Sequence, residues 1–367
     1  MKNRVWIISE VYYPDESGGG HFMTEVAEGL AQFYNVKVLC GYPVNGQSDD
    51  IFAARETHNG VDIERCPSTN FDKNNFFLRL INMITISISI FIKALRKIRR
   101  NDLVIVVTTP PSLPFVMLAL CRLIAAKCVV RIEDVYPETL IATGLINEHQ
   151  AFAKLLFHMN EILYESADHI TVLGRDMKLL VEKRLNKHEA DKHITVVPNW
   201  ADLELIVPEQ KSDNTLLYEL GLQNKFVVQC AGNMGLAQGM EDIFKAVEGL
   251  KNEQDIHFLF IGSGAKRKWM EQEVADKKLT NVTLLNQRPR ADQPNFLNAC
   301  DVAIVSLLPK MTGAGVPSRM YNIMAAGKPI IAFAEKDSEL SIVVEEEGIG
   351  WSVSHRQPYR LIEIILF

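Results

Sequence analysis

The chain has 367 residues and a formal net charge of −6, from 39 Lys and Arg against 45 Asp and Glu. Its apolar fraction of 47% excludes intrinsic disorder for most of the chain. The Gly and Cys counts, 21 and 6, exclude collagen-like and disulfide-scaffold classes. This length makes two domains the natural expectation, and we expect no nucleic-acid partner.

A strand is predicted at the very start of the chain, over residues 5–9. No charged stretch, apolar stretch and cleavage site precede it, so we expect no signal peptide. No run of about 18 uncharged apolar residues is present, which argues against a membrane-spanning helix. We therefore expect a cytoplasmic protein.

Short Val- and Ile-rich runs alternate with helical patterns along the whole chain. Apolar residues on both faces are typical of parallel strands buried between helices, so the alternation predicts a doubly wound α/β architecture. The predicted strands are 5–9, 36–40, 61–65, 103–107, 128–132, 169–173, 194–197, 226–230, 257–261, 282–285, 302–305 and 329–333.

The alternation is interrupted by a polar stretch over residues 198–225, which contains Pro208 and a short helical pattern at 215–220. We place a domain boundary here. Residues 1–200 and 201–367 are then each expected to form one Rossmann-like domain. Residues 359–367 predict a helix that stops abruptly, so the second domain is expected to lack its terminal element.

The segment from Lys73 to Arg100 carries seven basic residues and no acidic residue around an apolar middle. Residues 84–90 alternate with the period of a strand, but the length without a helix breaker favours a helix. Basic and aromatic side chains beside an apolar face suit the surface of an anionic membrane. The alternative is a core helix with a solvated basic end.

Three consecutive glycines, Gly18, Gly19 and Gly20, follow the first strand and precede His21 and a helix predicted over 22–33. Glycines permit close approach of a ligand, and a helix N-terminus offers N–H groups to an anion. The spacing is not that of a dinucleotide-binding loop. A loop without a ligand is the alternative.

A second glycine-rich loop, residues 231–239, lies between a predicted strand and a predicted helix. Such loops at the carboxyl ends of parallel strands bind ligands in α/β domains, and a diphosphate is the expected guest. Gly262 and Gly264 follow the next strand, where a tight turn is an equal alternative. Farther on, Ser318 is predicted to cap a helix that presents Arg319 and Asn322 one turn apart.

The six cysteines form no C-x-x-C pair and stand in part inside apolar runs, which predicts buried free thiols. No His and Cys cluster has the spacing of a zinc site.

Four features in this order resemble family 4 glycosyltransferases of the GT-B fold, over essentially the whole chain. They are the early Gly-Gly-Gly loop, the Pro-Asn-Trp-Ala-Asp run 198–202, the loop 232–239, and the Pro-Ser-Arg-Met-Tyr-Asn-Ile-Met-Ala-Ala-Gly-Lys-Pro run 317–329. The last run and Glu-Asp-Val-Tyr-Pro-Glu at 133–138 most resemble the WbuB-type subgroup. Its members add N-acetyl-L-fucosamine to bacterial surface-polysaccharide units.

The resemblance also exposes departures. The Arg and Lys that neutralise the donor diphosphate in this family align with Asn233 and Gln238, and its two glutamates align with Ala314 and Asn322. Neutral side chains lose charge-assisted hydrogen bonds to phosphate. Arg319 is the residue that could supply the missing cation. A rebuilt site, a slow enzyme and an inactive paralogue all remain open.

The resemblance implies a UDP-sugar donor, transfer with retention of configuration, no metal or other cofactor, and a lipid-linked saccharide acceptor at the inner face of the cytoplasmic membrane. The departing diphosphate can take the acceptor's proton, so no dedicated protein base is required. Asp134 and Glu138 are candidates to hold acceptor hydroxyls, and the alternative is that they are structural acids of the loop. With Gly20 and His21 they form the set of catalytic candidates. The expected donor-binding residues are Gly232, Asn233, Gly235, Gln238, Gly239, Gly262, Gly264, Arg288, Pro317, Ser318, Arg319 and Asn322. The expected acceptor-binding residues are Gly18, Gly19, Asn199 and Arg175, the last alternatively a solvated helix start.

Two rivals come from other classes. A UDP-sugar 2-epimerase should carry acids and a His near the diphosphate loop, and residues 232–239 contain none. An inactive GT-B scaffold in a polysaccharide assembly complex would account for the four neutral substitutions. A dehydrogenase is a more distant alternative.

Overall fold

The structure is a computed structural model that describes residues 3–43, 52–72, 76–185, 194–355 and 357–367. The chain forms two compact units, here called unit 1 (Met1–Pro137 and His149–Pro198) and unit 2 (Glu138–Glu148 and Asn199–Phe367). The main division follows Pro198, two residues before the expected boundary. The segment Glu138–Glu148, which we expected in the first domain, belongs to unit 2.

Unit 1 contains an eight-stranded sheet in the order β3-β4-β2-β1-β5-β6-β7-β8, parallel except for the antiparallel pair β3 and β4. All seven strands predicted for this region are present. The additional strand, β3, was missed because its residues Arg-Glu-Thr-His are polar. The strands are β1 (Arg4–Ile8), β2 (Asn35–Gly41), β3 (Arg55–His58), β4 (Val61–Cys66), β5 (Leu103–Val107), β6 (Lys127–Arg131), β7 (His169–Val172) and β8 (Ile194–Val196).

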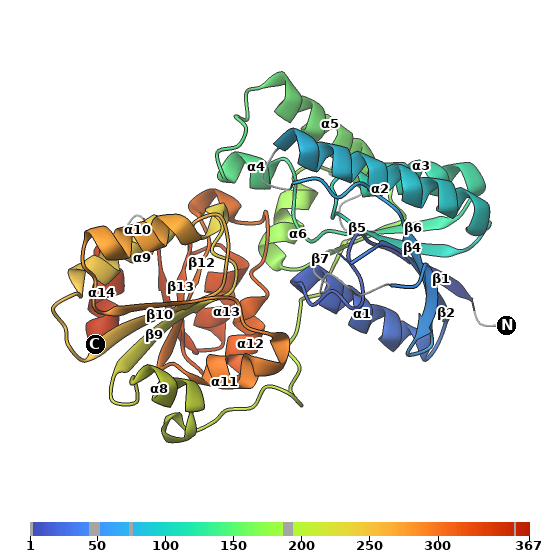
Figure 1. Cartoon of the computed structure of the whole chain (residues 1–367). Coiled ribbons are helices and arrows are strands. Elements are labelled where there is room, and N and C mark those ends of the chain that lie inside the picture. Colours follow the sequence, from blue (N-terminus) through green and yellow to red (C-terminus); the bar gives the residue numbers. More distant parts are fainter. Residues whose placement is uncertain (1–2, 44–51, 73–75, 186–193, 356) are drawn as a thin grey trace. The chain divides into compact units, whose positions relative to one another are not determined.

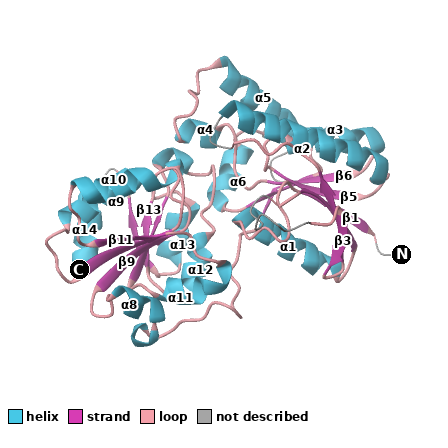
Figure 2. Ribbon diagram, viewed as in Figure 1, coloured by secondary structure: helices cyan, strands magenta, loops and turns pink. Residues whose placement is uncertain are grey.

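Helices cover both faces of this sheet, with α1 on one side and α2, α3 and α5 on the other (Figures 1 and 2). The helices are α1 (Gly18–Ala31), α2 (Phe76–Lys97), α3 (Leu113–Ile124), α5 (Ala151–Ser166) and α6 (Arg175–Glu182). The three glycines form the first turn of α1, so the predicted glycine loop is wrong and the helix begins earlier than expected. The segment predicted from Lys73 is a helix, α2, although Lys73 itself lies outside the described residues.

Unit 2 contains a six-stranded, fully parallel sheet in the order β11-β10-β9-β12-β13-β14. The strand order reverses between β9 and β12, and α/β sheets bind ligands at the carboxyl ends of strands at such a point. The strands are β9 (Phe226–Ala231), β10 (Ile256–Ile261), β11 (Val282–Leu285), β12 (Val302–Ser306), β13 (Ile330–Phe333) and β14 (Gly350–Val353), of which β14 was not predicted.

The helices of unit 2 lie on both faces of its sheet, with α9, α10 and α14 on one side and α8, α11 and α12 on the other (Figure 1). They are α4 (Glu138–Ala142), α8 (Thr215–Leu220), α9 (Met240–Gly249), α10 (Arg267–Asp276), α11 (Gln293–Asn298), α12 (Arg319–Ala325), α13 (Glu339–Glu346) and α14 (Pro358–Leu366). Single 3-10 turns are η1 (Lys211–Asp213), η2 (Leu236–Gln238), η3 (Arg290–Asp292) and η4 (Pro309–Met311).

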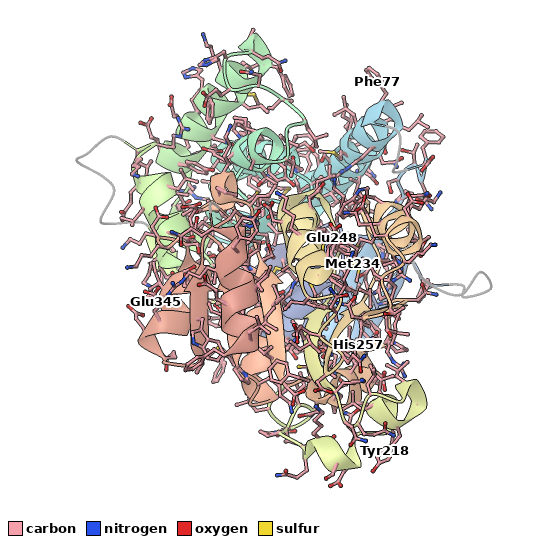
Figure 3. All side chains as sticks on the ribbon, turned by 90° about the vertical axis from the view of Figure 1, so that its left-hand side faces the viewer. Phe77, Tyr218, Met234, Glu248, His257 and Glu345 are labelled. Atoms are coloured by element: carbon pink, nitrogen blue, oxygen red, sulfur yellow. The ribbon has the colours of Figure 1, made fainter. Side chains whose placement is uncertain are left out.

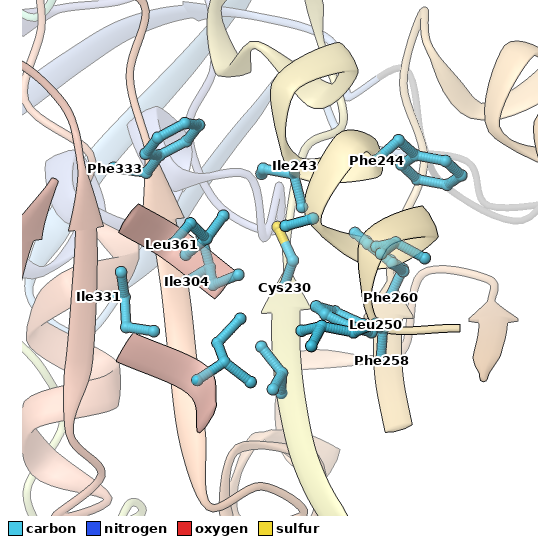
Figure 4. Close-up of a cluster of buried hydrophobic side chains, with 14 of the residues drawn as sticks. Cys230, Ile243, Phe244, Leu250, Phe258, Phe260, Ile304, Ile331, Phe333 and Leu361 are labelled. Atoms are coloured by element: carbon cyan, nitrogen blue, oxygen red, sulfur yellow. The ribbon is translucent and has the colours of Figure 1, made fainter. Parts of the chain in front are cut away.

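A continuous apolar core fills unit 2 between its sheet and α9, α10 and α14 (Figure 4). Phe244, Phe258 and Phe260 are almost completely buried in it. Leu361 and Ile365 of α14 also belong to this core. The predicted helix at the end of the sequence is therefore present as α14 and packs into the core of unit 2.

All six cysteines are buried and unpaired, as predicted. Burial raises the pKa of Cys40 to about 12 and that of Cys66 to about 11. These thiols are therefore neutral and unreactive at physiological pH.

Candidate functional site

The glycine-rich loop after β9 is fixed by hydrogen bonds to its own unit. The N–H of Gly232 donates to the carbonyl of Ile261 at 2.8 Å, and the N–H of Met234 donates to the carbonyl of Ser263 at 2.8 Å. The N–H of Gly235 donates to Oε1 of Gln238 at 2.9 Å. The expectation that this loop presents its N–H groups freely to a diphosphate is therefore wrong for these three groups, because each is already used.

Gly262 and Gly264 have a packing role rather than a direct ligand role. A Cβ on Gly262 would lie 2.0 Å from the carbonyl oxygen of Gly232, and one on Gly264 would lie 2.5 Å from that of Met234. Both residues also have positive φ angles, +146° and +147°. Only glycine permits this close contact between the two loops, so the tight-turn alternative accounts for these residues.

The far end of the loop is held by His355, which sequence reasoning missed. A Cβ on Gly239 would lie 2.6 Å from Cε1 of His355. Nδ1 of His355 lies 2.9 Å from Oδ2 of Asp242, and the Ser306 hydroxyl donates to the carbonyl of Gln238 at 2.5 Å. These contacts join β12 and the segment after β14 to the loop, and no local pattern around residue 355 indicates them.

Arg319, at the start of α12, lies directly against this loop. Its Nη1 donates to the carbonyl of Ala231 and its Nη2 to the carbonyl of Asn233, each at 3.2 Å. The guanidinium carbon would be 3.3 Å from a Cβ on Gly232. Within the described residues no carboxylate pairs with Arg319. Burial lowers the pKa of Arg319, and its site favours an added anion.

Asn322 lies one turn farther along the same helix. Its Oδ1 is buried and has no hydrogen-bond partner within the described part of the chain. An unpaired buried acceptor costs free energy unless a ligand supplies a donor. Ala314, aligned with the other family glutamate, is fully buried and offers no polar side chain.

The remaining donor-site predictions have mixed outcomes. Asn233 is exposed beside the Arg319 contact, while Gln238 uses its oxygen for the loop and keeps only its amide N–H groups. Arg288 pairs with Asp292 instead of contacting the loop in any recorded interaction. Ser318 follows Pro317 and is the N-cap residue of α12, as predicted, but its side chain makes no capping hydrogen bond.

Among the described residues of unit 1, two cavities of about 240 and 250 Å³ lie at the carboxyl edge of the sheet. Glu10, after β1, and Asn82, on α2, line both. Arg79 and Tyr136 line the second cavity. No described carboxylate pairs with Arg79, and sequence reasoning missed this residue because only the packing of α2 brings it to the sheet edge.

Asp134 lies next to this edge, just after β6. Its backbone carbonyl accepts from the Thr108 hydroxyl at 3.2 Å, but its carboxyl group has no recorded partner among the described residues. Burial, and then the nearby charge of Glu133, raises the pKa of Asp134 to about 6. The acid that pairs with Arg131, at 2.8 Å, is Glu133 and not Asp134. Burial likewise raises the pKa of Tyr136. A carboxyl group whose pKa is raised by burial and by a nearby like charge is typical of functional sites.

The first turn of α1 serves the fold of unit 1. A Cβ on Gly20 would lie 2.6 Å from the carbonyl oxygen of Asp15, and the Gly20 N–H already faces the Ser17 hydroxyl at 3.5 Å. Nε2 of His21 lies 3.1 Å from Oε1 of Glu25. Packing therefore requires glycine at position 20, and the catalytic roles of Gly20 and His21 stay predictions.

Three further predicted residues lie outside the contacts described above. Glu138 begins α4 and Asn199 is buried, and both belong to unit 2. Arg175 is exposed at the start of α6. Within the described ranges, no group of three or more His, Cys, Asp or Glu side chains could hold a metal ion.

Known proteins resemble this chain in sequence and fold. The sequence model of the family Glycosyl transferases group 1 matches residues 218–366. The chain is 29% identical over 364 residues to the Pseudomonas aeruginosa protein named "Probable glycosyltransferase WbjE", covering 99% of this chain and 88% of that protein. It is 24% identical over 346 residues to WcaI of Escherichia coli (strain K12), named as a colanic acid biosynthesis glycosyl transferase, covering 91% and 84%.

The structure of HepE from Anabaena with UDP and glucose superposes with a TM-score of 0.70 at 15% identity, over 99% of this chain and 89% of that one. A likeness at this identity shows the fold alone, which is the expected GT-B fold of two parallel-sheet units. The match of residues 218–366 to the Glycosyl transferases group 1 model and the similarity to proteins named as glycosyltransferases over nearly the whole chain support a transferase enzyme.

Proposed function

We propose that the enzyme transfers a sugar from a UDP-sugar to a lipid-linked saccharide during synthesis of a bacterial surface polysaccharide, with retention of configuration and without a metal. The observation that carries the proposal is Arg319, a partly buried cation that no described carboxylate neutralises and that lies against the backbone of Gly232. HepE, of the same fold, was solved with UDP, and the relative WcaI is named for colanic acid synthesis.

In this proposal Arg319 binds the diphosphate of the donor. Two of its N–H groups hold backbone carbonyls, which fixes the guanidinium, and the other N–H groups remain to donate to phosphate oxygens. As the bond between C1 of the sugar and the phosphate oxygen breaks, the departing oxygen gains negative charge. A cation fixed in advance stabilises that charge without reorganising. Arg319 thus does the work of the Arg and Lys replaced by Asn233 and Gln238.

Asn322 binds the ribose in this proposal. Its unpaired Oδ1 accepts from a ribose hydroxyl, which satisfies the buried oxygen. The neutral amide can accept this hydrogen bond as the family glutamate does, although the bond lacks the assistance of a charge.

The acceptor binds at the carboxyl edge of unit 1. The oxygen of the attacking hydroxyl forms the new bond to C1, and its proton passes to the departing phosphate. Asp134 accepts a hydrogen bond from a second hydroxyl of the acceptor and so positions the acceptor. Its raised pKa of about 6 leaves it ionised at neutral pH yet poorly solvated, so a hydroxyl donor stabilises it. The transferred sugar we propose is N-acetyl-L-fucosamine or a related 6-deoxy or N-acetyl sugar, on the resemblance of residues 133–138 and 317–329 to the WbuB-type subgroup.

We also place the enzyme at the inner face of the cytoplasmic membrane, held by α2. Six exposed apolar side chains follow one another at helical spacing on α2 and are here called the apolar stripe: Phe77, Ile81, Ile84, Ile88, Ile92 and Leu95. Figure 3 shows the ring of Phe77 extending beyond the ribbon. By length and composition, Phe77–Lys97 could also cross a membrane. However, Ile86, Ile90 and Ala94 on the opposite face are fully buried in unit 1, which favours a helix lying on the surface.

Calorimetric titration with UDP tests the donor site, first with a chelator and then with magnesium. We expect micromolar binding that is indifferent to magnesium. Arg319→Gln should weaken it about 30- to 100-fold, since charge-assisted hydrogen bonds contribute about 2–3 kcal/mol. The matched control is Lys251→Gln, which removes an exposed cation from the same unit and should leave the affinity unchanged.

Absence of UDP binding, or an Arg319→Gln affinity equal to that of the wild type, would overturn the donor site. Conversion of a UDP-sugar to its 2-epimer without an acceptor would overturn transfer as the activity. Product analysis with a lipid-linked acceptor then reports the anomeric configuration directly.

A further inference from the structure

A third cavity of unit 1 lies away from the carboxyl edge and has no part in the proposed chemistry. It measures about 540 Å³ and lies near the beginnings of β1, β2 and β4 and at the last turn of α2. Arg4 and Trp6 of β1 line it, as do Arg96 and Arg99 at the end of α2. A headgroup-sized ligand would fit this volume.

The walls of this cavity are strongly basic. Six basic side chains line it against three acidic ones: Arg4, Lys37, Arg55, Arg96, Lys97 and Arg99 against Glu56, Asp62 and Glu64. The acids are already engaged by neighbours. Lys37 pairs with Asp62 at 2.6 Å, and Lys97 pairs with Glu64. Burial raises the pKa of Glu64, but the bonds and charges of its lysine neighbours outweigh this and hold the pKa below its ordinary value.

Two cations of the cavity remain without a carboxylate partner among the described residues, Arg96 and Arg99, and both are exposed. Arg4, by contrast, pairs with Asp102 at 2.9 Å, and Trp6 donates to the same carboxylate at 3.0 Å. The cavity therefore combines ion-paired side chains with two guanidinium groups that have no carboxylate partner among the described residues. Guanidinium groups in such a setting suit a phosphate, which they can bind through two parallel hydrogen bonds.

The same two arginines continue the apolar stripe. Leu95 is the last residue of the stripe, Arg96 follows it directly on α2, and Arg99 comes two residues after Lys97, the last residue of that helix. When the stripe enters the apolar boundary of a bilayer, the end of α2 is at the depth of the phosphates.

We propose that this cavity binds the headgroup phosphate of an anionic phospholipid, with Arg96 and Arg99 as its ligands. The inference rests on the proposed membrane association and adds to it a lipid-specific site. An unspecific basic surface would bind anionic membranes through any exposed cation, whereas binding in this cavity requires Arg96 and Arg99.

The test uses the full-length protein and vesicles of phosphatidylcholine with or without phosphatidylglycerol. Sedimentation should show tighter binding to the anionic vesicles. Arg96→Gln combined with Arg99→Gln should weaken that binding about 100-fold and leave binding to pure phosphatidylcholine unchanged. The matched control is Arg100→Gln, an exposed cation at the same helix end that does not line the cavity. Its loss should not exceed the about fivefold contributed by one charge near an anionic surface.

A second readout reports the cavity itself. The emission of Trp6, taken as the difference between the wild type and Trp6→Phe, should change with anionic vesicles for the wild type and for Arg100→Gln, but not for the Arg96 and Arg99 variant. A silent Trp6, or equal losses per charge for all three arginines, would overturn the site. An equal Trp6 response to soluble glycerol 3-phosphate would overturn the lipid as its ligand.

Failure of this inference is distinguishable from failure of the proposed function. Ile84→Ser with Ile88→Ser should abolish binding to both vesicle types by removing the stripe. If the wild type binds neither vesicle, the membrane association fails and this site with it. UDP titration is done without vesicles, so it tests the donor site independently of either outcome.

Discussion

The carboxyl edges of the two sheets are built in different ways. In unit 2 three N–H groups of the loop after β9 donate to acceptors of the same unit. Among the described residues, Arg319 has no carboxylate partner and the Oδ1 of Asn322 has no hydrogen-bond partner. In unit 1 the edge is open, with two cavities, with Arg79, which no carboxylate of the described residues pairs with, and with the poorly solvated Asp134. The first edge suits one invariant ligand, such as a nucleoside diphosphate. The second suits a ligand that differs between related enzymes, as an acceptor does.

The two units should differ most in how they tolerate the replacement of one glycine by alanine. Gly262→Ala places a Cβ 2.0 Å from a backbone carbonyl at a φ of +146°. We expect a loss of about 3–5 kcal/mol in the free energy of unfolding, and loss of UDP binding, because the backbone cannot move aside cheaply. Gly19→Ala in unit 1 meets only Val11 at 3.5 Å and should be neutral or slightly stabilising. Equal effects in urea unfolding would contradict the distinction between the edges.

Asp134→Asn should separate activity from stability. It removes the charge-assisted hydrogen bond that positions the acceptor, so kcat should fall about 100-fold while UDP affinity is unchanged. The wild-type pKa is raised from 3.8 to about 6, so between these pH values the folded state holds a proton that the unfolded state lacks. The free energy of unfolding therefore falls as pH rises through this window and remains lowered at pH 7.

Asparagine does not ionise, so the free energy of unfolding of the variant does not fall in this pH window. It should be more stable than the wild type at pH 7 by up to about 3 kcal/mol, with the difference vanishing near pH 4. Thermal unfolding across pH measures this. A variant less stable at pH 7 would show that Asp134 has a stabilising partner and is a structural acid.

Arg79→Gln tests the open edge without touching the donor. We expect the KM for the acceptor to rise about 10-fold, because a charge-assisted hydrogen bond is lost, and the dissociation constant for UDP to stay the same. Arg100→Gln is the control on the same stretch of chain. A change in UDP affinity with an unchanged acceptor KM would contradict this division of roles.

The smallest effect is expected for Asn322→Ala. Removing the unpaired Oδ1 should weaken UDP binding only about fivefold, since a neutral hydrogen bond contributes about 1 kcal/mol. The loss should be smaller for a UDP analogue without ribose hydroxyls. Calorimetry with both nucleotides measures the difference, and equal losses would mean that Asn322 does not contact the ribose.

Sequence reasoning found the architecture because the parallel strands are buried on both faces and therefore form apolar runs. It missed β3, whose residues are polar, and it placed the start of α1 after Gly20 because three glycines are unfavourable inside a helix. At the site, Arg319 and Asn322 were predicted from residue type and helical spacing. The contacts of His355 and Arg79, and the use of the Gly235 N–H by Gln238, depend on tertiary packing that no local pattern contains.

The segment Glu138–Glu148 has a consequence for how this protein is made and divided. It is synthesised within unit 1, yet α4 packs against η4, and the Thr139 hydroxyl donates to the carbonyl of Ala314 at 3.5 Å. During translation this segment is synthesised well before η4 and Ala314, so it cannot make these contacts until those residues have been added. Cutting the chain at residue 200 would leave it on the wrong fragment, so two separately expressed halves would each be incomplete at this point.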